Sequence, residues 1–224
     1  MDRNLGATGT LYSLSTTNAQ NYPTYGLYYQ FGRFNPIPKA VAGTVVGTQP
    51  TYQADGTTVT NFPVILEGPI TPAVAIQNPQ TFVKLPRSGL TNWSTADINA
   101  FWGNGTTKSV YDPCPEGWRV GPKNVWDDFG STWLTSGNAP GPYKNPAWES
   151  ANVDIGGCLY KAGEVKAFYP TQGYRNNGSG DLHDIGGNGF LWSSRTTRYQ
   201  YHYLSLDYID GSVADANAIR CIQE

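Results

Sequence analysis

The residues best suited to chemistry lie near the end of the sequence, where tyrosines alternate with serine, aspartate and asparagine. The stretch from 199 to 217 contains Tyr199, Tyr201, Tyr203, Ser205, Asp207, Asp210, Asp215 and Asn217. Tyrosine offers a large, rigid contact area with a hydroxyl, and the shorter polar residues add adaptable hydrogen bonds. We therefore expect these residues to bind a ligand from one exposed face.

The alternation within residues 201–208 predicts a strand whose side chains point to opposite faces in turn. One set contains Leu204 and Leu206, which favour the core, together with His202 and Tyr208. The other set is then expected to face solvent. Its members are Tyr201, Tyr203, Ser205 and Asp207.

Other titratable residues are expected to have structural roles. The run from Asp181 to Asp184 could supply metal ligands, but aspartates beside glycines more often hydrogen-bond their own backbone in turns. The Trp-Asp-Asp sequence at 126–128 lies in a predicted helix, which argues against a calcium-lectin triplet. His202 falls on the apolar face of its strand. No catalytic triad or carboxylate pair stands out, so we expect no catalytic residue, metal site or cofactor.

The composition favours short strands, turns and large anchoring rings. Charged residues make up 14% of the 224-residue chain and aromatic residues 13%, with 26 Gly, 16 Pro and one Met. A net charge of −2 and no basic run argue against a nucleic-acid partner. No run of 18 apolar residues predicts a membrane span. The sequence opens without a basic and apolar leader, so we expect either a cytosolic protein or a mature fragment.

The elements predicted to position these residues give a mixed α+β fold. The aromatic run 25–31 predicts a strand, and 36–90 predicts a loop-rich insertion with short strands. Ser94 and Asp97 have capping-box spacing before a predicted helix over 93–103. Proline at the first helical position predicts a second helix over 122–133.

The three cysteines do not complete an even set of disulfides. They are Cys114, in a Pro-Cys-Pro setting, Cys158, after two glycines, and Cys221, three residues from the end. We expect one disulfide and one buried thiol, with three reduced thiols as the alternative.

Six blocks in order along the whole chain resemble the Fibrobacter succinogenes major paralogous domain, a family of bacterial surface proteins. They include Gly-Leu-Tyr-Tyr-Gln-Phe-Gly-Arg and Asp-Pro-Cys-Pro-Glu-Gly-Trp-Arg-Val. The blocks are Met1–Ala7, Gly26–Arg33, Ile76–Phe82, Tyr111–Val120, Phe190–Ser194 and Ile219–Ile222.

This resemblance implies a single domain over 1–224 with a fold similar to C-type lectins and formylglycine-generating enzymes. Such a fold has two helices, a twisted, mostly antiparallel sheet and long loops. Gly26–Arg33 and Ala218–Ile222 would be central or near-central strands, with the N- and C-terminal strands close together. Trp118, Trp126 and Trp192 would be buried.

The resemblance also implies export and a place in a longer surface or pilus protein. Cys114 and Cys221 match cysteine positions of the family, which implies a disulfide between them and leaves Cys158 as a thiol. The same match argues against a redox enzyme related to formylglycine-generating enzymes.

A second resemblance concerns residues 190–224, which look like the variable region of proteins diversified by retroelements. Mutated adenines in Asn-type codons cannot give Lys, Glu, Gln, Met or Trp. Between Arg195 and Ile219 only Gln200 falls outside the permitted set. The alternative is a plain exposed hairpin rich in tyrosine.

Together these features predict an extracellular, non-catalytic binding domain of the adhesin or receptor type. The target, a surface protein or a glycan, stays open. A structural pilus module and an enzyme are the alternatives.

Overall fold

The computed structural model describes residues 1–9, 24–37, 51–52, 58–59, 65–79, 81–86, 89–103, 107–129, 148–152, 157–162, 165–202 and 205–224. Within these ranges the side chains at 51–52, 58–59, 127–129, 148–152, 157–162, 165–166, 197, 199, 201–202, 205–208 and 210 lie outside the description.

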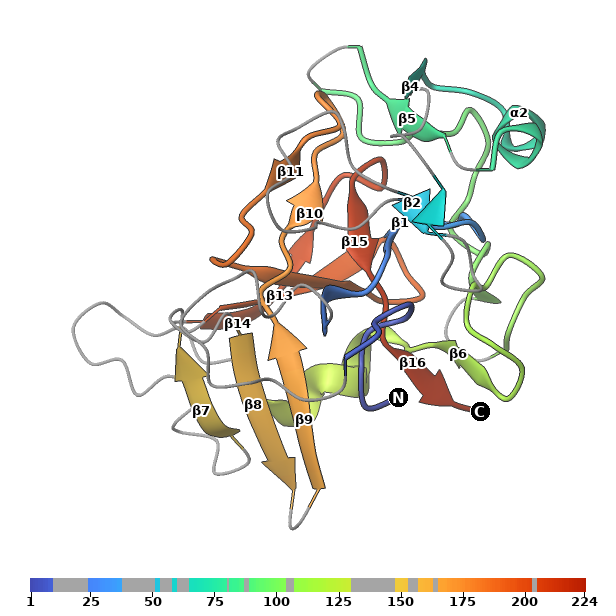
Figure 1. The fold of residues 1–224 in the computed structure, drawn as a ribbon. Coiled ribbons are helices and arrows are strands. Elements are labelled where there is room, and N and C mark those ends of the chain that lie inside the picture. Colours follow the sequence, from blue (N-terminus) through green and yellow to red (C-terminus); the bar gives the residue numbers. More distant parts are fainter. Residues whose placement is uncertain are drawn as a thin grey trace.

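A seven-stranded sheet forms the centre of the structure (Figure 1). Its strand order is β11-β10-β15-β12-β13-β14, and β1 also pairs with β15. The β12–β15 pairing is parallel, through Leu191 and Ala218, and the other pairings in this sheet are antiparallel. The strands are β1 (Tyr28–Gln30), β10 (Tyr174–Arg175), β11 (Leu182–His183), β12 (Gly189–Trp192), β13 (Thr197–His202), β14 (Ser205–Asp210) and β15 (Ala216–Ala218).

Four smaller sheets surround this centre. The pair β4 and β5 is parallel, and the other three sheets are antiparallel. Figure 1 shows the sheet β7-β8-β9 extending to one end of the molecule, with β4 and β5 at the other. The described structure is thus mostly sheet and mostly antiparallel. The strands are β2 (Thr51–Tyr52), β3 (Thr58–Val59), β4 (Ile65–Glu67), β5 (Phe82–Lys84), β6 (Trp118–Val120), β7 (Trp148–Asn152), β8 (Gly157–Ala162), β9 (Val165–Pro170) and β16 (Cys221–Gln223).

The helix predicted over 93–103 is wrong, because this segment forms turns and bends. The two residues read as a capping pair instead close separate turns. Ser94 Oγ accepts the N–H of Ala96 at 3.0 Å, and Asp97 Oδ1 accepts the N–H of Asn99 at 2.9 Å. Such local bonds from Ser and Asp compete with helix formation.

The second predicted helix is present as a 3-10 helix, η2 (Lys123–Phe129), and residues 130–133 lie outside the description. A helix that was not predicted, α2 (Pro72–Gln77), lies in the 36–90 insertion. Thr71 is its N-cap, with Oγ1 accepting the N–H of Val74 at 3.3 Å, and Pro72 fills the first turn. None of the helices among the described residues is long and apolar enough to cross a bilayer.

Aromatic rings pack around the β1 segment. The ring of Phe31 lies 4.7 Å from that of Trp102 and 5.6 Å from that of Trp192, between centroids. The indole N–H of Trp192 donates to Tyr29 O at 2.7 Å, and that of Trp93 donates to Phe31 O at 2.8 Å. These bonds satisfy the polar end of each buried ring and fix it to the strand.

Two of the three tryptophans predicted to be buried are buried. Trp126 and Trp192 are in the core, but Trp118 is only partly buried at the edge of the main cluster. Trp118 belongs to β6, whose register pairs it with Gln223 close to the C-terminus.

The N- and C-terminal strands lie together, as predicted, because β1 pairs with β15, and the two ends of the chain also meet (Figure 1). The terminal amine of Met1 donates to Cys221 O at 2.6 Å, and Leu5 N donates to Ile219 O at 2.8 Å. The disulfide between Cys114 and Cys221 is present. The predicted single strand over 218–222 is instead divided between β15, which is central, and β16, which pairs with β6. The side chain of Cys158 lies outside the described residues.

A buried guanidinium joins α2 to the central sheet. Arg33 is 5% exposed, and its Nη2 donates to Asn78 O at 3.0 Å and Pro79 O at 3.2 Å after the helix. Its Nη1 donates to Gln30 Oε1 at 3.0 Å and also to Thr81 O. Burial lowers the pKa of Arg33 to about 10, so it stays cationic at neutral pH.

Candidate ligand-binding site

Residues 201–208 do not form the single strand that the alternation predicted. The chain reverses between β13 and β14, and the register pairs His202 with Ser205 and Tyr201 with Leu206. Gln200 pairs with Asp207, and directly paired positions share a face of the sheet. Positions 201 and 207 therefore lie on opposite faces of the ladder. The alternation argument needs a continuous strand and therefore does not apply across this hairpin.

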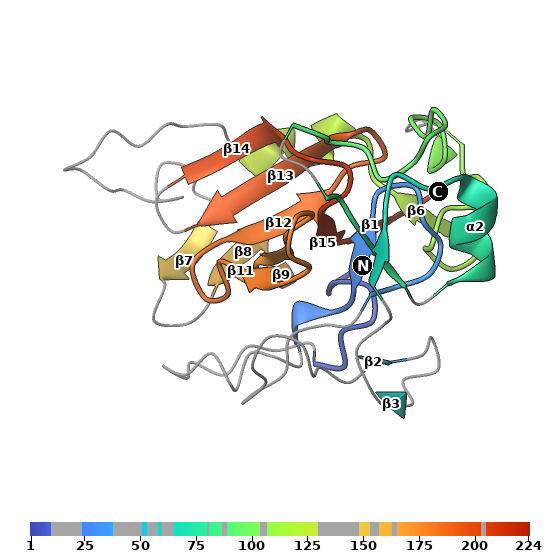
Figure 2. The ribbon, with the colours of Figure 1, turned by 90° about the horizontal axis from the view of Figure 1, so that it is seen from above.

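Figure 2 shows β12, β13 and β14 side by side, with β14 at the edge. Most of the predicted ligand-binding side chains are on this hairpin but outside the description, so their exposure stays a prediction. They are Tyr199, Tyr201, Tyr203, Ser205, Asp207 and Asp210. The same holds for the core positions predicted for His202, Leu204, Leu206 and Tyr208.

Asp215 and Asn217 are not on an exposed face, and this part of the prediction is wrong. Asp215 is 4% exposed and Asn217 is fully buried. The reason is the position of β15, which pairs with β1, β10 and β12 inside the sheet. Alternation along one strand carries no information about such pairing.

The buried partner of Asp215 is Arg198, on β13. Arg198 Nη1 lies 2.9 Å from Asp215 Oδ2, and their side chains are 11% and 6% exposed. The guanidinium carbon also lies 4.7 Å from the ring centroid of Phe190 and 4.9 Å from that of Tyr174. An ion pair and two cation–π contacts thus fix the base of the hairpin to β10, β12 and β15.

Two donors of this cluster have no partner among the described residues, Arg198 Nε and Asn217 Nδ2. Asp215 Oδ1 accepts the N–H of Asn177 at 2.9 Å. Burial raises the pKa of Asp215, and Arg198 and the Asn177 N–H oppose this only in part. In this cluster the positive charge of Arg198 is balanced by Asp215, but two buried polar atoms have no hydrogen-bond partner among the described residues.

A cleft of about 260 Å³ opens beside this base. Its floor contains Ile98 and Val213, which are 1% and 8% exposed. The lining residues are Thr91, Asn92, Ile98, Asn99, Thr196, Gly211 and Val213. One wall comes from the turns at 91–99, which replaced the predicted helix, and the other from the two ends of the hairpin.

Hydrogen bonds hold the two walls together. Thr91 O accepts from Ser212 Oγ at 3.0 Å and from Ala214 N at 3.2 Å. Asn92 Oδ1 accepts the N–H of Ser94 at 2.9 Å, which orients its amide. Gly211 covers Arg198, because a Cβ added to this glycine would lie 2.7 Å from Arg198 Nε.

A second, smaller pocket lies between α2 and the β1 turn. Its rim carries two exposed apolar side chains, Phe34 at 52% and Ile76 at 58%. The stacked rings of Phe101 and Tyr111, 4.6 Å apart, form one wall. The volume of about 40 Å³ is room for roughly one water molecule at ~30 Å³ each. This pocket is too small for a ring-sized ligand.

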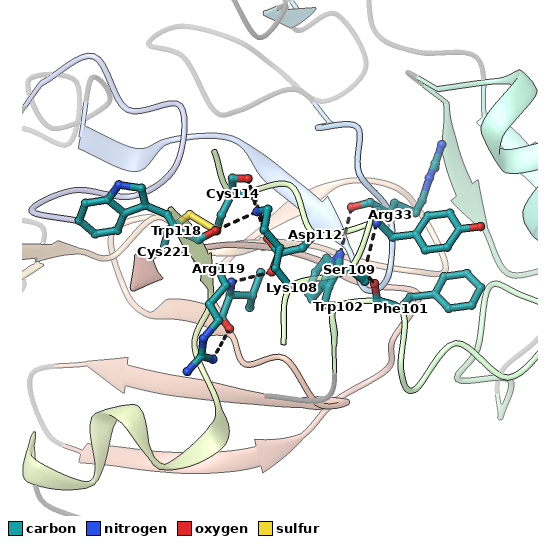
Figure 3. A network of polar contacts seen from close by, with 12 residues as sticks. Arg33, Phe101, Trp102, Lys108, Ser109, Asp112, Cys114, Trp118, Arg119 and Cys221 are labelled. Atoms are coloured by element: carbon teal, nitrogen blue, oxygen red, sulfur yellow. Dashed lines mark hydrogen bonds and ion pairs between the residues drawn. A yellow bond between two sulfur atoms is a disulfide. The ribbon is translucent and has the colours of Figure 1, made fainter. Parts of the chain in front are cut away.

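The motif around Cys114 forms a structural network (Figure 3). The buried carboxylate of Asp112 accepts the N–H groups of Cys114 and Val120, both at 2.9 Å. Lys108 Nζ donates to Asp112 Oδ1 at 3.2 Å and to Trp118 O at 2.8 Å. These contacts fix the disulfide loop to β6, and every polar group described in them already has a partner inside the protein.

The run 181–184 is strand followed by a bend rather than the predicted turn, because Leu182–His183 forms β11. Leu182 pairs with Arg175 in the sheet. The turn follows at Asp184, which has a φ of 59° and whose main-chain O accepts the N–H groups of Gly187 and Asn188. Among the described residues no group of three or more His, Cys, Asp or Glu could hold a metal ion.

The sequence drew attention to the tail but not to Arg198 or to the asparagines of the opposite wall. Arginine is among the residues that the mutated codons permit, so this pattern gave no reason to single out Arg198. Nothing in the sequence links residues 91–99 to the hairpin base. Searches with the chain against protein-family models, curated proteins and solved structures find no match.

Proposed function

We propose that this chain is a non-catalytic ligand-binding domain of an extracellular surface protein, of the adhesin or receptor type. The proposal includes membership of the Fibrobacter succinogenes major paralogous domain family, which the sequence motifs resemble, with a C-type-lectin-like fold and a diversified tail. Its ligand would contact the β13–β14 hairpin and the cleft at its base.

The observation that carries the proposal is the contrast between the base of the hairpin and the cleft beside it. The Arg198–Asp215 pair holds the base rigidly to the central sheet. Directly beside it, a cleft of about 260 Å³ stays open between two hydrogen-bonded walls. A variable, polar-aromatic segment presented from a fixed scaffold is how loops carry binding in many folds.

The disulfide agrees with an extracellular location, because disulfides persist in oxidising compartments and are rare in the cytosol. It ties the last strand to the motif around Cys114, whereas the hairpin is held by its pairing with β12 and by the Arg198–Asp215 pair.

A binding screen against immobilised glycans and bacterial or host surface proteins tests this function. Truncating Tyr201 and Tyr203 to Ala should weaken binding by at least ~2 kcal/mol if they are hot spots. Thermal stability should change little, since surface substitutions usually cost within about 0.5 kcal/mol. The matched control replaces the same two residues with Phe, which keeps the rings and removes only the hydroxyls. Full binding by the alanine variant would contradict the proposal.

A further inference from the structure

We propose that the cleft at the hairpin base binds an uncharged sugar residue and does so without a metal ion. This inference rests on the proposed ligand-binding function and adds the class of ligand. The evidence is the chemistry of the cleft lining, its unused hydrogen-bonding groups and its volume.

The cleft combines an apolar floor with a neutral polar rim. Ile98 and Val213 form the floor. The rim consists of two amides and two hydroxyls, from Thr91, Asn92, Asn99 and Thr196. A sugar ring presents C–H groups on its faces and hydroxyls at its edge, which matches this division of the lining.

The rim retains unused hydrogen-bonding capacity. Within the described part of the chain, the side-chain amide of Asn99 makes no hydrogen bond, and Asn92 uses only its Oδ1, toward Ser94. An amide both donates and accepts, and so does a threonine hydroxyl. A sugar hydroxyl also does both, so each rim group can pair with it in either sense.

Charge argues against ionic ligands. None of the residues that line the cleft is charged. The nearest buried cation, Arg198 beneath Gly211, is neutralised by Asp215 at 2.9 Å. A carboxylate or ammonium ligand would lose its hydration without gaining a partner, which is costly. Calcium prefers carboxylate oxygens, which this lining lacks, so we expect binding that is insensitive to chelators.

The volume indicates a single residue as the occupant. About 260 Å³ corresponds to roughly nine water molecules at ~30 Å³ each. The 40 Å³ pocket beside α2 fails the same criterion. The cleft therefore suits one sugar ring, with the rest of a glycan extending toward the hairpin.

Titration of the whole chain with methyl glycosides tests the proposal. The probes are the methyl glycosides of glucose, galactose, mannose and N-acetylglucosamine, with methyl glucuronide as the charged counterpart, each with and without EDTA. We expect at least one neutral probe to bind, EDTA to have no effect, and the glucuronide to bind at least tenfold more weakly than the neutral probe of the same ring shape.

Three variants locate the site. Asn99→Ala and Thr196→Val should each weaken binding of the neutral probe about five- to tenfold, the effect of one lost hydrogen bond. Asn124→Ala removes an exposed amide on η2 and should leave the affinity unchanged. Thermal unfolding of each variant checks that the fold is retained.

The inference is wrong if no neutral glycoside binds, if EDTA abolishes binding, if the glucuronide binds as well as the neutral probes, or if the two cleft variants bind like the Asn124 control. Tyrosine-dependent capture of a protein or peptide, with no glycoside bound, would overturn the sugar site and leave the proposed ligand-binding function standing. If neither glycoside binding nor tyrosine-dependent capture is found, both the sugar site and the proposed ligand-binding function are wrong.

Discussion

Arg198 and Asp215 are seventeen residues apart and form an ion pair of 2.9 Å across the central sheet. Arg198 is on β13 and Asp215 immediately precedes β15, with β12 between these strands. Their contact anchors the start of β13 to the residue before β15, and the pairing of β13 with β12 continues from Arg198 to Tyr201.

Replacing Arg198 with Ala should lower the free energy of unfolding by about 3–5 kcal/mol, because it leaves a buried carboxylate without its partner. Arg198→Lys should lie between this variant and the wild type, since it keeps the charge but not the planar group over Phe190. Urea unfolding measures both. Arg195→Ala, at an exposed position on the same segment, is the control and should change stability within about 0.5 kcal/mol. Equal effects of the two alanine substitutions would contradict the anchor.

Asp215→Asn should change how stability depends on pH. Burial raises the pKa of Asp215 above its ordinary value of 3.8, so the folded state binds its proton more tightly than the unfolded state. As pH falls from neutral through the raised pKa to about 3.8, the wild type should gain stability relative to the Asn variant. Below that range the difference should stay constant.

Urea unfolding of the two proteins at several pH values between 7 and 3 measures this difference. The opposite slope would show that attraction to Arg198 outweighs the loss of hydration at Asp215. Asp97→Asn, at an exposed turn position, controls for changes in net charge.

The scaffold was more predictable than the site because its signals are local or come from recognisable blocks. The apolar run over 25–31 predicted the β1 segment, and two motif cysteines predicted the disulfide. Helix α2 could also have been predicted, from Thr71 and Pro72 at its start. Its short length and the surrounding glycines and prolines obscured this signal.

The site was less predictable because its geometry depends on contacts between distant strands. Residues 201–206 include no Gly, Asn or Asp, so nothing in the sequence indicated a hairpin within the alternating stretch. Ser94 and Asp97 suit both a helix start and local turns, and only packing against the sheet decides between them. The burial of Asp215 likewise follows from strand order.

Removing the disulfide should destabilise the whole fold. Cys114 and Cys221 are separated by 107 residues, and closing a loop of this size stabilises by roughly 4–5 kcal/mol in the chain-entropy model. The Cys114→Ala/Cys221→Ala variant should unfold at correspondingly lower urea concentration. Thiol titration of the unfolded, unreduced wild type should detect one free group, from Cys158. Detection of three would contradict the bridge.

Adding a methyl group at Gly211 should disturb the anchor directly. A Cβ at this position would lie 2.7 Å from Nε and 2.9 Å from Cζ of Arg198, which the ion pair prevents from moving away freely. Gly211→Ala should therefore cost about 1–3 kcal/mol, as overpacking of a well-packed site usually does.

A double-mutant cycle with Arg198→Ala tests the cause of this cost, because contacting residues show interaction energies that distant ones lack. In the Arg198→Ala background the methyl group meets no guanidinium, and the cost of Gly211→Ala should fall to within about 0.5 kcal/mol. Gly187→Ala is a suitable control, since its added Cβ would meet only Asp184 O at 3.5 Å, an ordinary contact. If Gly211→Ala costs the same in both backgrounds, the glycine is needed for the chain path between β14 and β15, and the cover over Arg198 is incidental.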